Sequence, residues 1–141
     1  MSKITDHFST EEMFCHCPRC KGKTPPAAVV KNLTLLAQTL EKFRGKWGAI
    51  TVDNAYRCPA HNKEVRGAKG SFHMTGLAAD IIFGDRKEAD MFFAAAGIPV
   101  KAIPAAPAKG SLFKGVGYYP NKGFCHVDIA RVKPRPNTWK G

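Results

Sequence analysis

Apolar residues recur at steps of three and four over residues 27–44 and form one stripe: Val30, Leu33, Leu36, Leu40 and Phe43. This spacing predicts an amphipathic helix that ends near Gly45 and Gly48. Residues 85–96 show a second helical pattern, which Gly97 ends. The stretch "HFSTEEMF" predicts a short helical turn that its serine or its threonine can cap.

Strand patterns occur in "AITVDNAY", "LAADIIF", "GVGYYP" and "FCHVDIARV", the last two separated by the turn "NKG". The stretch "RCPAHNKEVRGAKG" predicts a loop that can contain one helical turn, residues 98–111 predict a Pro/Ala-rich loop, and the tail "KPRPNTWKG" predicts an extended segment. Short helices packed on a small, mainly antiparallel sheet make an α+β fold. A length of 141 residues suits a single domain over residues 1–141.

Basic residues outnumber acidic ones by 22 to 11, which gives a net charge of +11. This excess predicts an anionic partner: nucleic acid, an anionic envelope, or an acidic polymer such as peptidoglycan. Lysine and arginine are spread along the chain without a basic block, so charge alone does not select among these. The N-terminus is polar, and no apolar run approaches the ~20 residues of a membrane span. We therefore expect a monomer made in the cytoplasm, without a signal peptide or a transmembrane segment.

The run "GSFHMTGLAAD" places His73 and Asp80 on either side of Gly76, next to a predicted strand. On one straight helix seven residues rise about 10 Å, too far for two side chains to share a metal. Gly76 allows a sharp turn, so His73 on the loop can face Asp80 at the start of the strand. A buried carboxylate needs a charged or hydrogen-bonded partner, and a divalent cation is one.

The segment "FCHVDIA" supplies a further histidine, His126. Strand residues two apart share a face, so His126 and Asp128 point the same way. His126 can complete a His/Asp/His set, and three protein ligands leave a fourth position for water, as in catalytic zinc sites. The alternative from spacing alone is that His73, Asp80 and His126 are ordinary loop and strand residues with local hydrogen bonds.

These stretches resemble the M15 family of zinc peptidases. The run "SFHMTGLAAD" fits S-x-H-x-x-G-x-A-x-D, the motif of D-Ala-D-Ala carboxypeptidases, dipeptidases and phage L-alanyl-D-glutamate endopeptidases. The segments "HFSTEEMFCHC", "TVDNAYRCPAHNKEVRGAKGSFHMTGLAADI" and "GVGYYPNKGFCHVDI" follow in the order of the compact branch that includes phage lysins. The resemblance covers most of residues 7–129.

The resemblance implies one catalytic zinc ion bound by His73, Asp80 and His126. It also implies that Arg57, in "AYRCPAHN", lies in the site, where its guanidinium would bind a peptide carboxylate or stabilise an oxyanion.

Three more residues near the motifs are candidates for substrate contact. Ser71 corresponds to the family's serine beside the first ligand, which contacts substrate or braces the loop. Tyr118 is expected to line the cleft together with Tyr119, and the alternative for both is strand packing.

At the position where many M15 members have their general base, this chain departs from the family pattern. Many M15 members have Glu or Asp three residues before the last histidine, whereas this chain has Gly123. Asp128 is the base candidate from its face beside His126, and its alternative role is to orient a ligating histidine. Glu64, in the loop after Arg57, is a further candidate.

The five cysteines are Cys15, Cys17, Cys20, Cys58 and Cys125. An odd count without a signal peptide argues against a secreted disulfide framework. A structural zinc needs four ligands, and "CHCPRC" holds the only C-x-x-C spacing, although Cys58 could approach by folding. We therefore favour thiols without a metal role over a structural zinc at Cys15, Cys17 and Cys20.

The expected function is zinc-dependent hydrolysis of peptidoglycan stem peptides, of the D,D-carboxypeptidase or L-Ala-D-Glu endopeptidase type, in a phage endolysin that acts on the cell wall. The positive charge would add affinity for an acidic cell envelope. One alternative is a basic zinc-binding nucleic-acid module that uses "CHCPRC", but it leaves His73, Asp80 and His126 without a purpose. Another is a catalytically inactive wall or tail domain of the same fold, which would explain Gly123.

Overall fold

The computed structural model describes residues 2–96, 112–131 and 137–141. The Pro/Ala-rich segment 98–111 lies outside these ranges. No helix within them is long and apolar enough to cross a membrane. The elements are β1 (Lys3–Thr5), β2 (Phe8–Ser9), α1 (Thr10–Met13), α2 (Ala27–Trp47), β3 (Thr51–Asn54), α3 (Pro59–Glu64), a 3-10 turn (Phe72–Thr75), β4 (Ala78–Ile82), α4 (Arg86–Ala96), β5 (Gly115–Tyr119), a 3-10 turn (Pro120–Lys122), β6 (Phe124–Asp128) and β7 (Asn137–Lys140).

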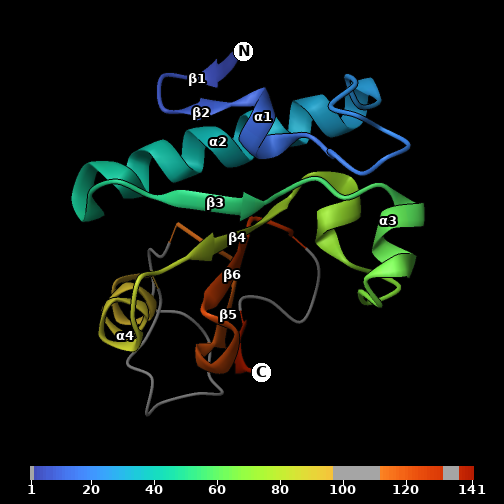
Figure 1. Ribbon diagram of the computed structural model, residues 1–141. Helices are drawn as coiled ribbons and strands as arrows, with labels where there is room; N and C mark the ends of the chain where they lie inside the picture. The colour runs from blue at the N-terminus through green and yellow to red at the C-terminus, as the bar shows by residue number, and fades with distance from the viewer. Residues whose placement is uncertain (1, 97–111, 132–136) are drawn as a thin grey trace.

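Within the described residues, five strands form one sheet in the order β3-β4-β6-β5-β7 (Figure 1). Its strand pairs are antiparallel except β5 with β7, which is parallel. Strands β1 and β2 form a separate antiparallel pair. The predicted α+β fold, with short helices on a mainly antiparallel sheet, is confirmed.

Helix α2 carries the predicted apolar stripe, of which Leu33, Leu36, Leu40 and Phe43 are buried and Val30 is half-buried; Ala37 is buried beside them. The helix passes through Gly45 and ends at Trp47, with the second predicted glycine, Gly48, as its C-cap. A glycine inside a helix costs about 1 kcal/mol relative to alanine. Packing offsets this cost, because the Trp47 ring lies 5.3 Å from the ring of Phe92 on α4.

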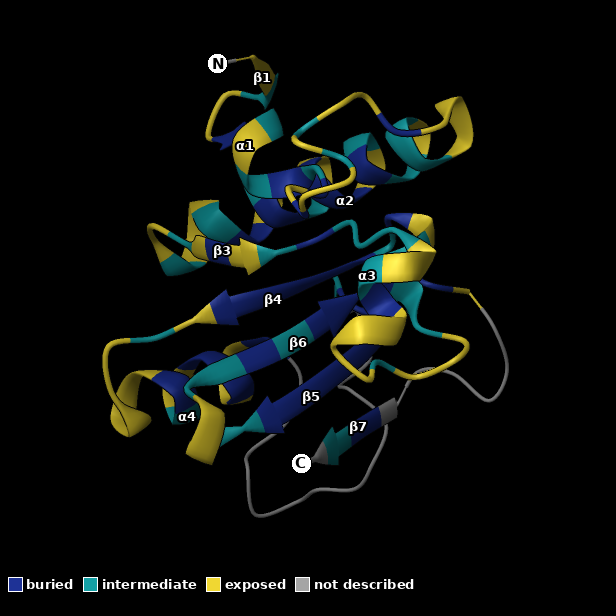
Figure 2. Ribbon diagram, turned by 45° about the vertical axis from the view of Figure 1, so that its right-hand side comes forward, coloured by how far each residue is buried: buried dark blue, intermediate teal, exposed yellow. Residues whose placement is uncertain are grey.

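Strand side chains alternate between a hydrophobic core and the opposite face of the sheet. Ile81 of β4, Val127 of β6 and Val116 of β5 belong to the core cluster that also contains the buried residues of α2 and α4. Figure 2 shows β4 and β5 as mostly buried strands. Because successive residues of a strand point to opposite faces, the residues between these positions face away from the core. That second face carries the candidate site.

The structure contains strands at both ends of the chain that the sequence pattern did not predict. The N-terminal residues form the pair β1–β2, and the tail segment expected to be merely extended contains strand β7, which lies beside β5. In this pairing Trp139 lies opposite Gly117. The last strand thereby brings a large aromatic side chain to the face opposite the core.

Candidate functional site

Residues at opposed positions form one row across the described sheet: Asn54, Asp80, His126, Gly117 and Trp139. Opposed residues on neighbouring strands project to the same face. The residues that alternate with Asp80 and His126 are buried and apolar, so the row lies on the face opposite the core. The register of the sheet therefore places a carboxylate beside an imidazole in the middle of this row.

His73 reaches the row from the 3-10 turn Phe72–Thr75, which ends at Gly76 in a left-handed conformation with φ of 80°. A side chain at Gly76 would be strained by this φ, and its Cβ would lie 2.9 Å from the carbonyl oxygen of Val29. The turn places His73 Nε2 3.3 Å from Asp80 Oδ1. The predicted sharp turn at Gly76 is confirmed.

Three ligand atoms converge here, namely His73 Nε2, Asp80 Oδ1 and His126 Nδ1, and they lie within 4.8 Å of one another. Asp80 Oδ1 is buried and has no hydrogen-bond partner among the described residues, although both histidine nitrogens face it. A buried carboxylate oxygen without a partner is costly, and a cation among the three atoms would supply one. The donor set fits zinc, which binds imidazole nitrogen and carboxylate oxygen.

The outer nitrogen of each histidine is held by an acceptor. His73 Nδ1 donates to the carbonyl oxygen of Ala55 at 2.7 Å, and His126 Nε2 donates to Asp128 Oδ2 at 2.8 Å. A carbonyl and a carboxylate accept only, so these nitrogens carry the protons. The lone pairs of His73 Nε2 and His126 Nδ1 are therefore directed toward Asp80, as metal ligands require.

Opposing effects act on the Asp80 carboxyl group. Burial raises its pKa, but the nearby His126 and His73 outweigh burial and hold the pKa well below its usual range. Asn54 Nδ2 also donates to Asp80 Oδ2 at 3.0 Å. The carboxylate is thus anionic at neutral pH and is held by β3 from one side.

The three residues line a pocket of about 410 Å³. Three basic side chains, Arg57, Arg66 and Lys122, also line it. The acidic lining residues in the described part of the chain are Asp80 and Asp128, and both contact histidines. The three basic side chains outnumber the two carboxylates, so the net charge of the pocket wall is positive, which favours an anionic ligand.

A family model described as Peptidase M15 matches residues 6–128. The chain belongs to the M15 peptidase family. A curated relative, the probable peptidoglycan L,D-endopeptidase MepK of Haemophilus influenzae, is 35% identical over 111 residues, or 78% of this chain and 47% of that protein. The chain thus spans about half the length of this relative.

The sequence offers two candidates for the general base, Asp128 and Glu64. Asp128 lies in the site, and Glu64 does not. Asp128 is fully buried, and its Oδ1 accepts the N–H of Ala130 while its Oδ2 holds His126. Glu64 pairs with Arg19 at 2.8 Å and does not line the pocket. Gly123 follows a 3-10 turn and brings no side chain. The contact between Asp128 Oδ2 and His126 Nε2 is the one that the orienting role requires.

Arg57 and Ser71 both line the pocket, as the M15 resemblance implies. The Arg57 backbone N–H donates to the His73 carbonyl oxygen at 2.9 Å, and its side-chain Nε is buried without a partner among the described residues. Arg57 therefore contributes to the pocket wall a basic side chain whose Nε the described residues leave unsatisfied. Ser71 caps the 3-10 turn, where its Oγ accepts the His73 N–H at 3.2 Å, and so braces the first ligand.

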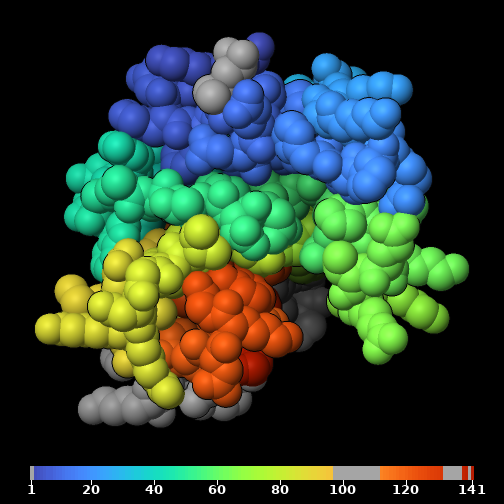
Figure 3. Space-filling model, in the orientation of Figure 1, coloured from blue at the N-terminus to red at the C-terminus, as the bar shows by residue number. Residues whose placement is uncertain are grey.

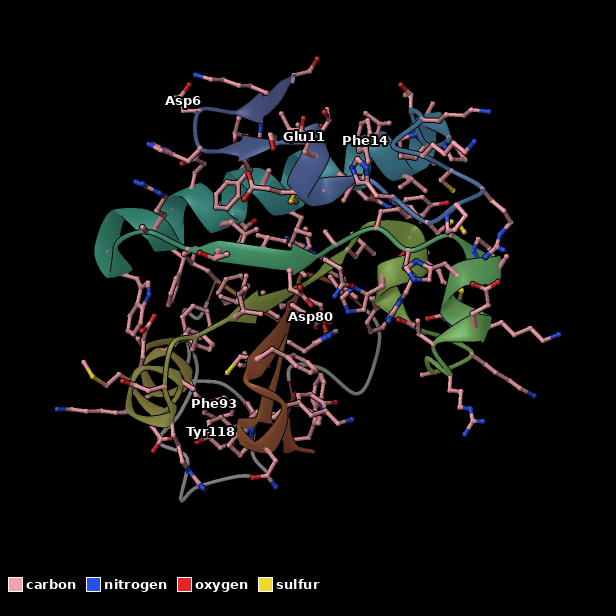
Figure 4. All side chains as sticks on the ribbon, in the orientation of Figure 1. Asp6, Glu11, Phe14, Asp80, Phe93 and Tyr118 are labelled. Carbon is pink, nitrogen blue, oxygen red and sulfur yellow. The ribbon has the colours of Figure 1, made fainter. Side chains whose placement is uncertain are left out.

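The prediction that Tyr118 lines the cleft is wrong. Tyr118 is fully buried in the core, where its ring packs against Phe93 and its hydroxyl donates to Asp90. Figure 4 shows Tyr118 and Phe93 together, apart from Asp80. Its strand neighbour Tyr119 lines the pocket instead, because strand side chains alternate.

Sequence reasoning did not identify Asn54, the Ala55 carbonyl or Trp139. The Trp139 ring lies 5.1 Å from that of His126, and its Nε1 donates to the Tyr119 hydroxyl at 2.7 Å. A Cβ at Gly117 would lie 2.5 Å from the Trp139 ring, so a glycine there makes room for it. The alternation of apolar and polar residues in its strand could have placed Asn54 on the site face. The position of Trp139 could not be found in this way, because it depends on the pairing of β7 with β5.

Proposed function

We propose that this protein hydrolyses a peptide bond in the stem peptides of peptidoglycan, with one zinc ion held by His73, Asp80 and His126. The observation that carries the proposal is the buried Asp80 Oδ1, which two histidine lone pairs face and which no described hydrogen-bond donor satisfies. M15 membership supports peptide hydrolysis, and the name of the relative supports peptidoglycan as the substrate.

A zinc ion at these three ligands would polarise a carbonyl and lower the pKa of a bound water toward about 7. The protein's own groups would position the two histidine ligands. Asp128 fixes the ring and tautomer of His126, and the Ala55 carbonyl does the same for His73. Ser71 holds the turn that carries His73.

Arg57 is proposed to contact the substrate directly. Its Nε lies buried without a described partner beside the ligand set, so binding a substrate oxygen would remove an unsatisfied donor. A guanidinium also matches a carboxylate or an oxyanion with two parallel hydrogen bonds. Arg57 is therefore assigned to a peptide carboxylate or to the oxygen that gains charge during hydrolysis.

The charge of the chain supports an acidic polymer as substrate. Arg57, Arg66 and Lys122 surround the ligand set, and the whole chain carries a net charge of +11. Such a surface attracts acidic stem peptides and an acidic envelope, and salt weakens the attraction. Because the relative is named an endopeptidase, we favour internal cleavage over removal of a terminal residue. We propose cell lysis, as by a phage endolysin, as the biological role.

Digestion of purified peptidoglycan tests the proposal. The zinc-loaded protein is expected to release peptide fragments whose masses identify one cleaved bond, and removal of zinc by a chelator should stop their release until zinc is restored. His126→Ala should be inactive, whereas His7→Ala, at an exposed histidine outside the pocket, should match the wild type. A folded, zinc-loaded wild-type protein that releases no fragment would overturn the proposal.

A further inference from the structure

Four cysteines from two distant segments meet outside the pocket just described. Cys15, Cys17 and Cys20 follow α1, Cys58 precedes α3, and their sulfur atoms lie within 4.8 Å of one another. Cys17 Sγ and Cys58 Sγ are 3.7 Å apart. Four sulfurs at about 2.3 Å from a central zinc ion lie about 3.8 Å from one another in a regular tetrahedron.

The backbone around these cysteines is folded so that their sulfurs converge. The N–H groups of Cys20 and Lys21 donate to the Cys17 carbonyl, and that of Gly22 donates to the Cys15 carbonyl. This tight turn brings three of the cysteines together. Cys58 is fixed independently, because its sulfur accepts the His61 N–H at the start of α3.

The environment of the cluster favours a bound cation over four free thiols. Cys15 and Cys17 are buried, and none of the four forms a disulfide. Soft thiolates in a set of four match zinc, and such a set leaves no coordination position for water or substrate.

We infer that Cys15, Cys17, Cys20 and Cys58 bind a second zinc ion, which has a structural role. The ion joins the N-terminal segment to the start of α3, two regions that Figure 3 shows in contact as light blue and green surfaces.

The ion would also fix one wall of the pocket without touching it. Cys58 directly follows Arg57, whose backbone N–H donates to the carbonyl of His73. The neighbouring Tyr56 N–H donates to the Met13 carbonyl, just ahead of the cysteine-rich turn. A bound ion at Cys58 would therefore stabilise the backbone of residues 56–58, which carries the Arg57 side chain.

Metal analysis of the purified full chain tests the inference without using activity. The wild type is expected to hold two zinc ions per chain, Cys20→Ser one, and His73→Ala one. Cys125→Ala, at the cysteine in the core outside the cluster, is the matched control and should hold two. A Cys20→Ser protein that keeps two zinc ions would overturn the inference.

Cobalt substitution identifies which site is filled. Cobalt-loaded His73→Ala should show the near-ultraviolet charge-transfer absorption of a cobalt–thiolate centre, and cobalt-loaded Cys20→Ser should lose it. If Cys20→Ser does not fold, the thiol reactivity of the unreduced wild type decides the question. In the folded protein, a chelator should expose Cys15, Cys17, Cys20 and Cys58 to a thiol reagent, and denaturation with the chelator should let all five thiols react. Equal reactivity with and without the chelator would overturn the inference, and fewer than five reactive thiols after denaturation would show that disulfides take the place of the metal.

Discussion

The two candidate metal centres of this molecule differ in their ligands and in what surrounds them. The first is built on a sheet face from His73, Asp80 and His126 and opens onto a pocket with basic walls. The second is built from four cysteines on loops and leaves no coordination position open. An incomplete ligand set beside a pocket suits catalysis, whereas a complete set of thiolates suits the joining of two chain segments.

The two centres also differ in how the chain supports their ligands. Each histidine of the first centre has an acceptor behind it, Ala55 or Asp128, which fixes its tautomer. The cysteine centre relies on backbone hydrogen bonds within the turn that carries Cys15, Cys17 and Cys20, and on the His61 N–H that donates to Cys58 Sγ. Supported ligands hold a metal in one geometry while substrate binds and leaves, and this is the property that a hydrolytic centre needs.

Removal of one ligand from each centre should give the largest contrast. His73→Ala is expected to lower hydrolysis by at least about 10³-fold, because a bound metal supplies several kcal/mol of transition-state stabilisation. Cys20→Ser should retain much more activity but melt at a lower temperature than His73→Ala. Rates on peptidoglycan and thermal melting curves of the two variants check this, and equal activity losses would remove the distinction.

Asp128→Asn tests whether the first centre depends on the partner of His126. The amide keeps the size of the side chain but holds the imidazole less well, so zinc affinity should fall by about 10–100-fold. Activity should return at saturating zinc, measured by titrating the metal into the assay. A loss of about 10²–10⁴ that persists with zinc bound would instead make Asp128 the general base.

Arg57→Lys examines the residue that lies between the two centres. Lysine keeps the charge but loses the planar pair of donors, so kcat/KM should fall about 10-fold or more. Both zinc ions should stay bound, because Arg57 belongs to neither ligand set. Kinetics of the metal-loaded variant on stem peptides check this, and wild-type kcat/KM would place Arg57 outside the reaction.

Gly76→Ala should disturb the turn that carries His73 of the first centre. The left-handed φ and the Val29 carbonyl 2.9 Å from the new Cβ predict a loss of about 1–3 kcal/mol in the free energy of unfolding. Gly45→Ala is the control, since open space surrounds that helical position and alanine should stabilise it by up to about 1 kcal/mol. Denaturant unfolding measures both, and equal stability changes would contradict the role given to the turn.

The sequence predicted the parts of the fold and site that depend on local pattern. The turn at Gly76 and the shared face of His126 and Asp128 follow from the conformational freedom of glycine and the two-residue period of strands. The stripe of α2 follows from helical periodicity in the same way.

Features that depend on which strands pair were not predictable from local pattern. Trp139 enters the site because β7 pairs with β5, and Cys58 joins the cysteine turn because α3 packs against the N-terminal segment. Tyr118 was assigned to the wrong face, since its direction follows from the register in which it lies opposite the buried Cys125.

Anomalous X-ray scattering at the zinc absorption edge, measured on crystals of the purified protein, tests the central claim most directly. The account predicts one peak among His73 Nε2, Asp80 Oδ1 and His126 Nδ1, and a second among the sulfurs of the four clustered cysteines. Absence of the peak among the histidines and Asp80 in zinc-loaded crystals would contradict the hydrolytic centre, and absence of the peak among the sulfurs would contradict the structural one.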